Sequence, residues 1–183
     1  MRLLPQLTGS ATYIRIDIST QQLTLIEGGL VARQYPVSTA AKGHGCEAGS
    51  YRTPIGLHRI KLKVGEGQPF GAVFVSRRPT GEVFSSTLRQ AAPDRDWILT
   101  RILWLDGLEV GRNRGGTVDT LRRHIYIHGT PDDGMSDPPS SHGCVRMFNS
   151  DIMDLFARVP AGTTVLIEAN ADQKESESER PGR

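Results

Sequence analysis

Cys144 and His128 are the two side chains in this sequence whose types and spacing best fit covalent chemistry. Cys144 ends the run Ser141-His-Gly-Cys just before an expected helix, whereas His128 ends an expected strand earlier in the chain. The intervening loop, Thr130–Ser140, is rich in Pro, Gly, Asp and Ser and can fold back to bring the two together. A thiol attacks well only after losing its proton, which an adjacent imidazole can accept. We therefore predict a cysteine nucleophile with His128 as its base.

Neighbouring groups complete this predicted site. The carbonyl of Gly129 is a local anchor for the second ring nitrogen of His128. The backbone N–H groups of Gly143 and Cys144, close to a helix start, are candidate oxyanion donors. Arg146 is expected on the same side as Cys144, where its fork can bind a substrate carboxylate. The structural alternative for Arg146 is an ion pair with one of three acids, Asp132, Asp133 and Asp151.

The tripeptide His-Gly-Cys occurs twice, so it does not identify a site by itself. The first copy, His44–Cys46, lies in a long Gly-rich loop, Ser38–Pro54, with no strand-borne histidine at a useful distance and no helix after it. The second copy has both. A lone cysteine is usually a small buried apolar residue. We therefore assign function to Cys144 and interpret Cys46 as an incidental loop residue that can still lie near the site.

Metal binding is the main rival chemistry. His124, His128, His142 and Cys144 offer nitrogen and sulfur ligands. However, His124 and His128 would be about 13 Å apart on an extended strand, and no C-x-x-C or H-E-x-x-H pattern is present. Ser140–Ser141 lacks the G-x-S-x-G context of a serine nucleophile. We therefore expect no metal, no cofactor and no catalytic serine.

Short alternating runs between Gly- and Pro-rich turns predict a mainly β domain that must position these residues. The expected strands are Tyr13–Ile18, Gln22–Glu27, Leu30–Val37, Leu57–Val64, Ala72–Ser76, Trp97–Leu105, Arg123–His128 and Thr163–Glu168. Gly28-Gly29 predicts a hairpin turn. One clear helix is expected over Asn149–Val159, with Asn149 or Ser150 as its cap. The turn-rich segment Arg77–Asp96 is a candidate flap.

Length and composition indicate one globular domain. The chain has 183 residues, of which 37% are hydrophobic and 23% charged. Its 22 basic and 20 acidic residues are too evenly balanced to argue for a nucleic-acid partner. Basic residues recur at Arg112, Arg114, Arg122 and Arg123, and we interpret most of them as a solvated face. The alternative is a modest pull on an acidic substrate. We expect a domain over residues 1–169 and a disordered, charged tail over 170–183.

The N-terminal segment bears on location. It has no apolar stretch of signal-peptide length, and no part of the chain resembles a transmembrane span. We therefore expect a cytoplasmic protein without membrane insertion. The periplasm is the alternative if a signal peptide is missing from this sequence. The sequence makes no prediction about the oligomeric state.

These motifs resemble the L,D-transpeptidase catalytic domain, also called the YkuD domain. In that family a histidine is followed, after a loop, by Ser/Thr-His-Gly-Cys, matched here by His128 and Ser141–Cys144. Ser38–Ala40, Gly49–Gly56 and Pro160–Ile167 also fit, so the resemblance runs from about Tyr13 to Glu168. It implies a β-sandwich of mixed sheets with one helix after the cysteine loop.

The resemblance also implies a reaction. The substrate would be a peptidoglycan tetrapeptide stem, attacked at the bond between the L-centre of its diamino acid and the terminal D-Ala. By residue match, Cys144 is the nucleophile and His128 the base, anchored at Gly129, while His142 and Gly143 shape the oxyanion region. The residues expected to contact substrate are Arg146, Tyr126 and Ser141.

The acceptor of the acyl group separates two activities. Water gives an L,D-carboxypeptidase that recycles muropeptides, whereas an amine gives an L,D-transpeptidase that forms 3–3 cross-links or exchanges D-amino acids. Cross-linking members work outside the cytoplasm and usually carry a signal peptide or anchor, which this sequence does not show. We therefore expect the carboxypeptidase, with peptidoglycan stem peptides or soluble muropeptides as partners. A catalytically silent muropeptide-binding module is the third alternative.

Overall fold

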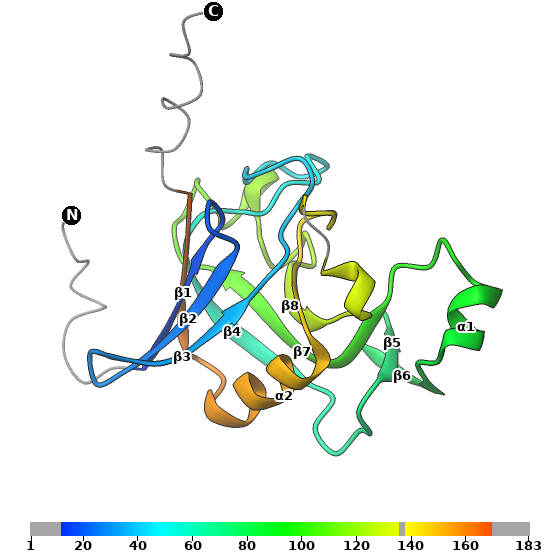
Figure 1. Ribbon diagram of the computed structural model, residues 1–183. Helices are drawn as coiled ribbons and strands as arrows, with labels where there is room; N and C mark the ends of the chain where they lie inside the picture. The colour runs from blue at the N-terminus through cyan, green and yellow to red at the C-terminus, as the bar shows by residue number, and fades with distance from the viewer. Residues whose placement is uncertain (1–11, 136–137, 170–183) are drawn as a thin grey trace, which may run out of the picture.

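The computed structural model describes residues 12–135 and 138–169 (Figure 1). The predicted disordered tail, 170–183, lies outside the described residues. The strands are β1 Tyr13–Asp17, β2 Gln22–Glu27, β3 Leu30–Pro36, β4 Gly56–Val64, β5 Ala72–Val75, β6 Arg78–Val83, β7 Ile98–Gly107, β8 Tyr126–Gly129, β9 Val145–Met147 and β10 Thr164–Glu168. The helices are α1 Ser86–Ala91 and α2 Asn149–Arg158, with short 3₁₀ turns at Gly116–Val118 and Asp132–Gly134. None of the described helices is long and apolar enough to cross a membrane.

One mixed sheet connects the strands of the described chain. Its main path runs β3-β2-β1-β10-β4-β7-β5-β6, and β8 joins β7 while β9 joins β8. The pairs β1–β10 and β8–β9 are parallel, and the other neighbours are antiparallel. Gly28 and Gly29 both have positive φ in the turn between β2 and β3, a conformation that glycine adopts without strain. The mainly β fold and this hairpin are confirmed.

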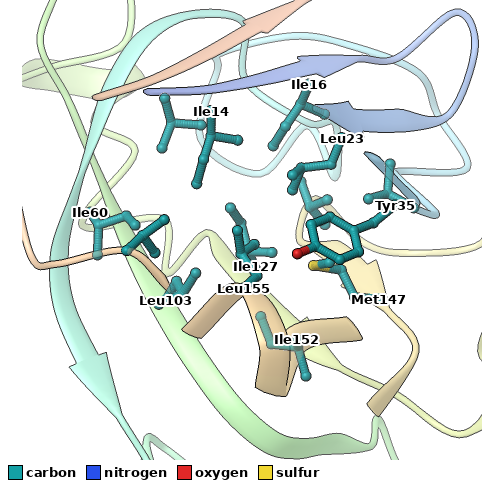
Figure 2. Close-up of a cluster of buried hydrophobic side chains, with 14 of the residues drawn as sticks. Ile14, Ile16, Leu23, Tyr35, Ile60, Leu103, Ile127, Met147, Ile152 and Leu155 are labelled. Atoms are coloured by element: carbon teal, nitrogen blue, oxygen red, sulfur yellow. The ribbon is translucent and has the colours of Figure 1, made fainter. Parts of the chain in front are cut away.

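The main core lies where the β1–β2 strands face β7, β8 and helix α2 (Figure 2). Figure 2 shows these side chains meeting; they include Ile14, Ile16, Leu23, Leu103, Ile127, Ile152 and Leu155, all fully buried. Burying each such side chain contributes about 1.5–3 kcal/mol. The strand β8 and the helix α2, which flank the predicted site, therefore stand on a well-packed base.

Four elements differ from the sequence predictions by more than two residues. The strand β9 is only three residues long, too short for alternation to reveal. The strand β6 and the helix α1 both lie within Arg77–Asp96, the segment expected to be a flap, and α1 buries none of its residues. The strand predicted from Arg123 begins only at Tyr126, because the preceding turn ends at His124, whose φ is 56°.

The predicted cap of α2 is wrong. Phe148 is the N-cap residue, and within the described chain it makes no side-chain capping hydrogen bond. The Asn149 side chain is buried instead: its Nδ2 donates to Thr130 O at 2.9 Å, and its Oδ1 accepts from Thr100 Oγ1 at 2.5 Å. This network joins α2 to β7 and to the end of β8, which carries His128. Asn149 therefore supports the strand that bears the predicted base.

Candidate active site

Strands β8 and β9 bring the two halves of the sequence motif side by side. They pair in parallel, with Ile127 opposite Val145 and His128 opposite Arg146. On its other side, Arg146 exchanges two backbone hydrogen bonds with Ser38, at 3.0 and 2.8 Å. Cys144 immediately precedes β9, and alternation along the strand places Cys144 and Arg146 on one side.

His128 is held as a neutral base. Its ring is buried, and its Nδ1 lies 2.7 Å from Gly129 O. Because a carbonyl only accepts, this nitrogen carries the proton and Nε2 keeps its lone pair. Burial lowers the pKa of His128, against smaller opposing effects of the Gly129 hydrogen bond and the Asp96 carboxylate, and Arg146 lowers it further. The ring is therefore uncharged near neutral pH.

Cys144 is held as a protonated thiol. Its sulfur accepts from the Tyr126 backbone N–H at 3.4 Å and donates to His124 O at 3.5 Å. Burial raises the pKa of Cys144 to about 12, although the Tyr126 hydrogen bond acts in the opposite direction. Within the described chain, no hydrogen bond joins this sulfur to the His128 ring. If His128 is the predicted base, the thiol proton would therefore have to reach it during the reaction rather than before it.

A cavity of about 240 Å³ collects most of the predicted site residues. Those that line it are Tyr126, His128, Ser141, His142, Cys144 and Arg146. Gly129 and Gly143 are not part of its wall, although each is bonded to residues that are. Cys144 is partly exposed there and His142 is exposed. The thiol of Cys144 and the ring of His128 thus line the same cavity.

The two predicted oxyanion donors are not equivalent. The Gly143 N–H donates to Ser141 Oγ at 3.2 Å, and the Ser141 hydroxyl donates to Cys144 O at 2.5 Å. Thr53 Oγ1 fixes the same turn by donating to Gly143 O at 3.0 Å. The Cys144 N–H has no hydrogen-bond partner among the described residues. Cys144 N–H is therefore the free donor of the predicted pair.

Arg146 pairs with an acid that the sequence analysis did not consider. Its Nη2 lies 3.0 Å from Asp96 Oδ1, and its Nη1 donates to Ser140 Oγ at 2.9 Å. None of the three acids considered from the sequence is its partner, and Asp133 binds Arg89 instead. Among the residues that the structure describes, the buried Arg146 Nε has no hydrogen-bond partner. That unused donor can serve a carboxylate or carbonyl oxygen entering from the cavity.

Arg123 is a functional candidate that the sequence analysis missed. Its guanidinium donates to Gly45 O at 3.1 Å, Cys46 O at 2.9 Å, Ser50 Oγ at 3.4 Å and Arg52 O at 2.6 Å, and it lines the Cys144 cavity. It thereby ties the first His-Gly-Cys copy to the rim of the site, while Cys46 itself donates to Ile55 O at 3.7 Å. The run of arginines was visible in the sequence, but not the partial burial of this one.

The protonation states predict how Cys144 reacts with iodoacetamide. A thiol whose pKa is raised is protonated at neutral pH, so its reactive fraction grows about tenfold for each pH unit below that pKa. We expect the alkylation rate to rise about a hundredfold between pH 7 and 9, measured by intact-protein mass spectrometry on a Cys46→Ala background. A rate that is flat between pH 6 and 8 would instead indicate a preformed thiolate–imidazolium pair.

Gly129→Ala should distort the anchor of His128. A Cβ at this position would lie 2.4 Å from Asn149 Oδ1 and 2.7 Å from Leu99 O, so the strand end or the start of α2 must move. We expect a loss of about 1–3 kcal/mol in the free energy of unfolding, the range typical of overpacking. Urea denaturation measures it. An unfolding free energy unchanged within about 0.5 kcal/mol, a shift typical of surface substitutions, would show that the space is not as tight as described.

Comparisons with known proteins match this chain to L,D-transpeptidases. The family described as the L,D-transpeptidase catalytic domain, YkuD, matches residues 11–167. The YkuD protein of Bacillus subtilis (strain 168) is 38% identical over 61 residues, which are 31% of this chain and 37% of that protein. An L,D-transpeptidase structure from Xylanimonas cellulosilytica has a TM-score of 0.51 at 21% identity, covering 92% of this chain and 65% of the other. A mutant L,D-transpeptidase of Enterococcus faecium gives 0.52 at 18%, covering 87% and 50%. Each match thus covers less than two thirds of the other protein, and the structures show a shared fold.

Proposed function

The chain belongs to the L,D-transpeptidase catalytic domain (YkuD) family, and from that premise we propose that it is a cysteine L,D-carboxypeptidase. Its substrate would be a peptidoglycan tetrapeptide stem, on the wall or as a soluble muropeptide, and its product the tripeptide and D-Ala. The observation that carries this proposal is the single cavity in which Cys144, His128 and Arg146 meet.

The first half-reaction follows from the two side chains. His128 Nε2 takes the thiol proton as the sulfur attacks the carbonyl of the diamino acid at its L-centre. The Cys144 N–H donates a hydrogen bond to the carbonyl oxygen as negative charge develops on it. As the tetrahedral intermediate collapses, the C–N bond breaks, and the imidazolium returns its proton to the departing amine of D-Ala. The acyl group remains on sulfur as a thioester.

Arg146 suits the leaving group. It lies next to His128 in the β8–β9 ladder, so a carboxylate bound there sits close to the amine that His128 protonates. A second cavity of about 160 Å³ extends past Arg146 between Asp96, Trp97 and Thr130. That volume is well below the roughly 300–1,000 Å³ of typical ligand pockets. It fits one amino acid better than a second stem peptide.

The small cavity also favours a second candidate. A free D-amino acid could enter it after D-Ala leaves and attack the thioester, which is the exchange form of L,D-transpeptidation. In the carboxypeptidase, a water molecule attacks with His128 as base and releases the tripeptide. Both share the same acyl-enzyme, and cross-linking is the variant that needs the most room.

The test is to incubate the protein with a disaccharide-tetrapeptide, with and without an added D-amino acid, and to follow masses. We expect loss of one D-Ala, with the tripeptide as the main product in both samples. Predominant incorporation of the added D-amino acid would favour the transpeptidase. An intact tetrapeptide would refute both. The cytoplasmic location stays a separate prediction, tested by cell fractionation.

A further inference from the structure

A third cavity, which Arg146 does not line, adjoins the Cys144 cavity. Its volume is about 350 Å³, and it shares His142, Ile125 and Arg123 with the Cys144 cavity. The cavity past Arg146 also shares His142 with the Cys144 cavity. The three cavities, which we call the groove, therefore adjoin at His142; Arg146 lines the Cys144 cavity and its smaller neighbour but not the third cavity, which Arg122 and Arg123 line.

The wall of this third cavity carries more positive than negative charge, because Arg122 and Arg123 line it against one acid, Asp119. Arg122 is exposed and forms no ion pair within the described chain, and Arg123 binds carbonyl and hydroxyl oxygens rather than a carboxylate. The acid in the wall, Asp119, is already committed: its oxygens accept from the N–H groups of Arg122 at 2.9 Å and Gly115 at 2.8 Å. Outside the wall, Glu47 is the other acid close enough to act on Arg123. Arg122 thus lines the cavity as an exposed cation that shares the charge of Asp119 without forming an ion pair among the described residues.

Hydrogen bonds hold the Arg123 guanidinium in place, whereas the Arg122 side chain is exposed. Four oxygens hold its guanidinium, and a Cβ built on Gly143 would lie 3.9 Å from its Nη2. Its charge is therefore fixed beside the cysteine turn. A cavity with the fixed charge of Arg123 and the exposed guanidinium of Arg122 suits a carboxylate. Arg122 can bind that carboxylate with two parallel hydrogen bonds.

The position of the base gives the groove a direction. His128 must reach the departing amine, and His128 lies beside Arg146, so the leaving D-Ala occupies the Arg146 side. The acyl part of the same substrate must then run from Cys144 the opposite way. That path leads past His142 into the cavity of Arg122 and Arg123.

Resting on the proposed function, we propose that the Arg122–Arg123 cavity binds the acyl side of the stem peptide and recognises a carboxylate on the residue before the diamino acid. Arg122 is the direct partner, and Arg123 is a positioning residue that supplies fixed charge and holds the loop of residues 45–52. Binding should favour an acidic stem over its carboxamide form.

The experiment uses the full chain with Cys144→Ala, so that binding is measured without turnover. Two synthetic tetrapeptides, identical except for a carboxylate or a carboxamide on that preceding residue, are titrated by calorimetry. We expect the acid to bind about tenfold tighter or more, as for a charge-assisted hydrogen bond. Adding Arg122→Gln should remove this preference. Adding Arg114→Gln should not, because Arg114 is an exposed arginine of the same loop that does not line the cavity. Unchanged thermal unfolding would show that both variants are folded.

The outcomes separate this proposal from the proposed function. Equal binding of the two peptides, or an equal loss of preference in both arginine variants, would overturn the carboxylate site even if the unmodified chain releases D-Ala. A preference that depends on Arg122 would support the site even if the unmodified chain releases no D-Ala, and the proposed function would then fail alone.

Discussion

Replacing Cys144 with alanine should reduce the release of D-Ala by at least about four orders of magnitude, the scale seen when a covalent nucleophile is removed. The methyl group cannot form the thioester, and the hydroxyl groups in the cavity wall are already hydrogen-bonded, Ser141 to Cys144 O and Tyr126 to Arg77. The rate is measured by incubating each protein alone with a disaccharide-tetrapeptide and following the loss of D-Ala by mass spectrometry. Retained peptide binding in this variant, together with full activity of the unmodified chain, would exclude the silent binding module.

Cys46→Ala is the matched control. It removes the second thiol of the same tripeptide, which bonds to Ile55 O and does not line the Cys144 cavity. We expect activity within about twofold of the unmodified chain, since substitutions away from such features rarely shift free energies by more than about 0.5 kcal/mol. Equal loss in both variants would mean that the first His-Gly-Cys copy takes part in the chemistry.

His128→Gln should lower turnover by about 10²–10⁴, the usual contribution of general acid–base catalysis. The amide cannot take a proton from the thiol or return one to D-Ala. Alkylation of Cys144 at pH 9 should change little, because burial and not an ion pair with His128 sets the pKa of the thiol. His44→Gln, an exposed histidine of the first tripeptide, is the control. Turnover of His128→Gln within tenfold of the unmodified chain would remove His128 as the base.

Much of the scaffold could be predicted from local pattern alone. The hairpin at Gly28-Gly29, the alternating strands and the helix after the cysteine turn each express a periodicity that lies within a few residues. The strand β9 could not be predicted in this way, because its three residues are too few to show alternation. Its parallel pairing with β8 is a long-range contact, and that pairing brings His128 beside Arg146.

The partners of the site residues were the least predictable part. Asp96 reaches Arg146 from a distant turn, whereas the three acids considered from the sequence lie nearer in the chain. The position of Asn149 predicts a helix cap, but its buried amide instead forms hydrogen bonds with Thr130 and Thr100. Arg123 reads as one of a solvated run, yet four oxygens of a loop far away in sequence hold it. In each case a tertiary contact overrides a local preference.

The thioester on Cys144 is the central claim, and trapping it is the most direct test. The chain is mixed with excess disaccharide-tetrapeptide, quenched in acid within milliseconds to seconds, and measured as intact protein before peptide mapping. The account predicts a mass increase equal to the disaccharide-tripeptide acyl group, located on the peptide that contains Cys144 and absent from Cys144→Ala. Release of D-Ala with the adduct on Cys46, or by a variant that lacks Cys144, would contradict it.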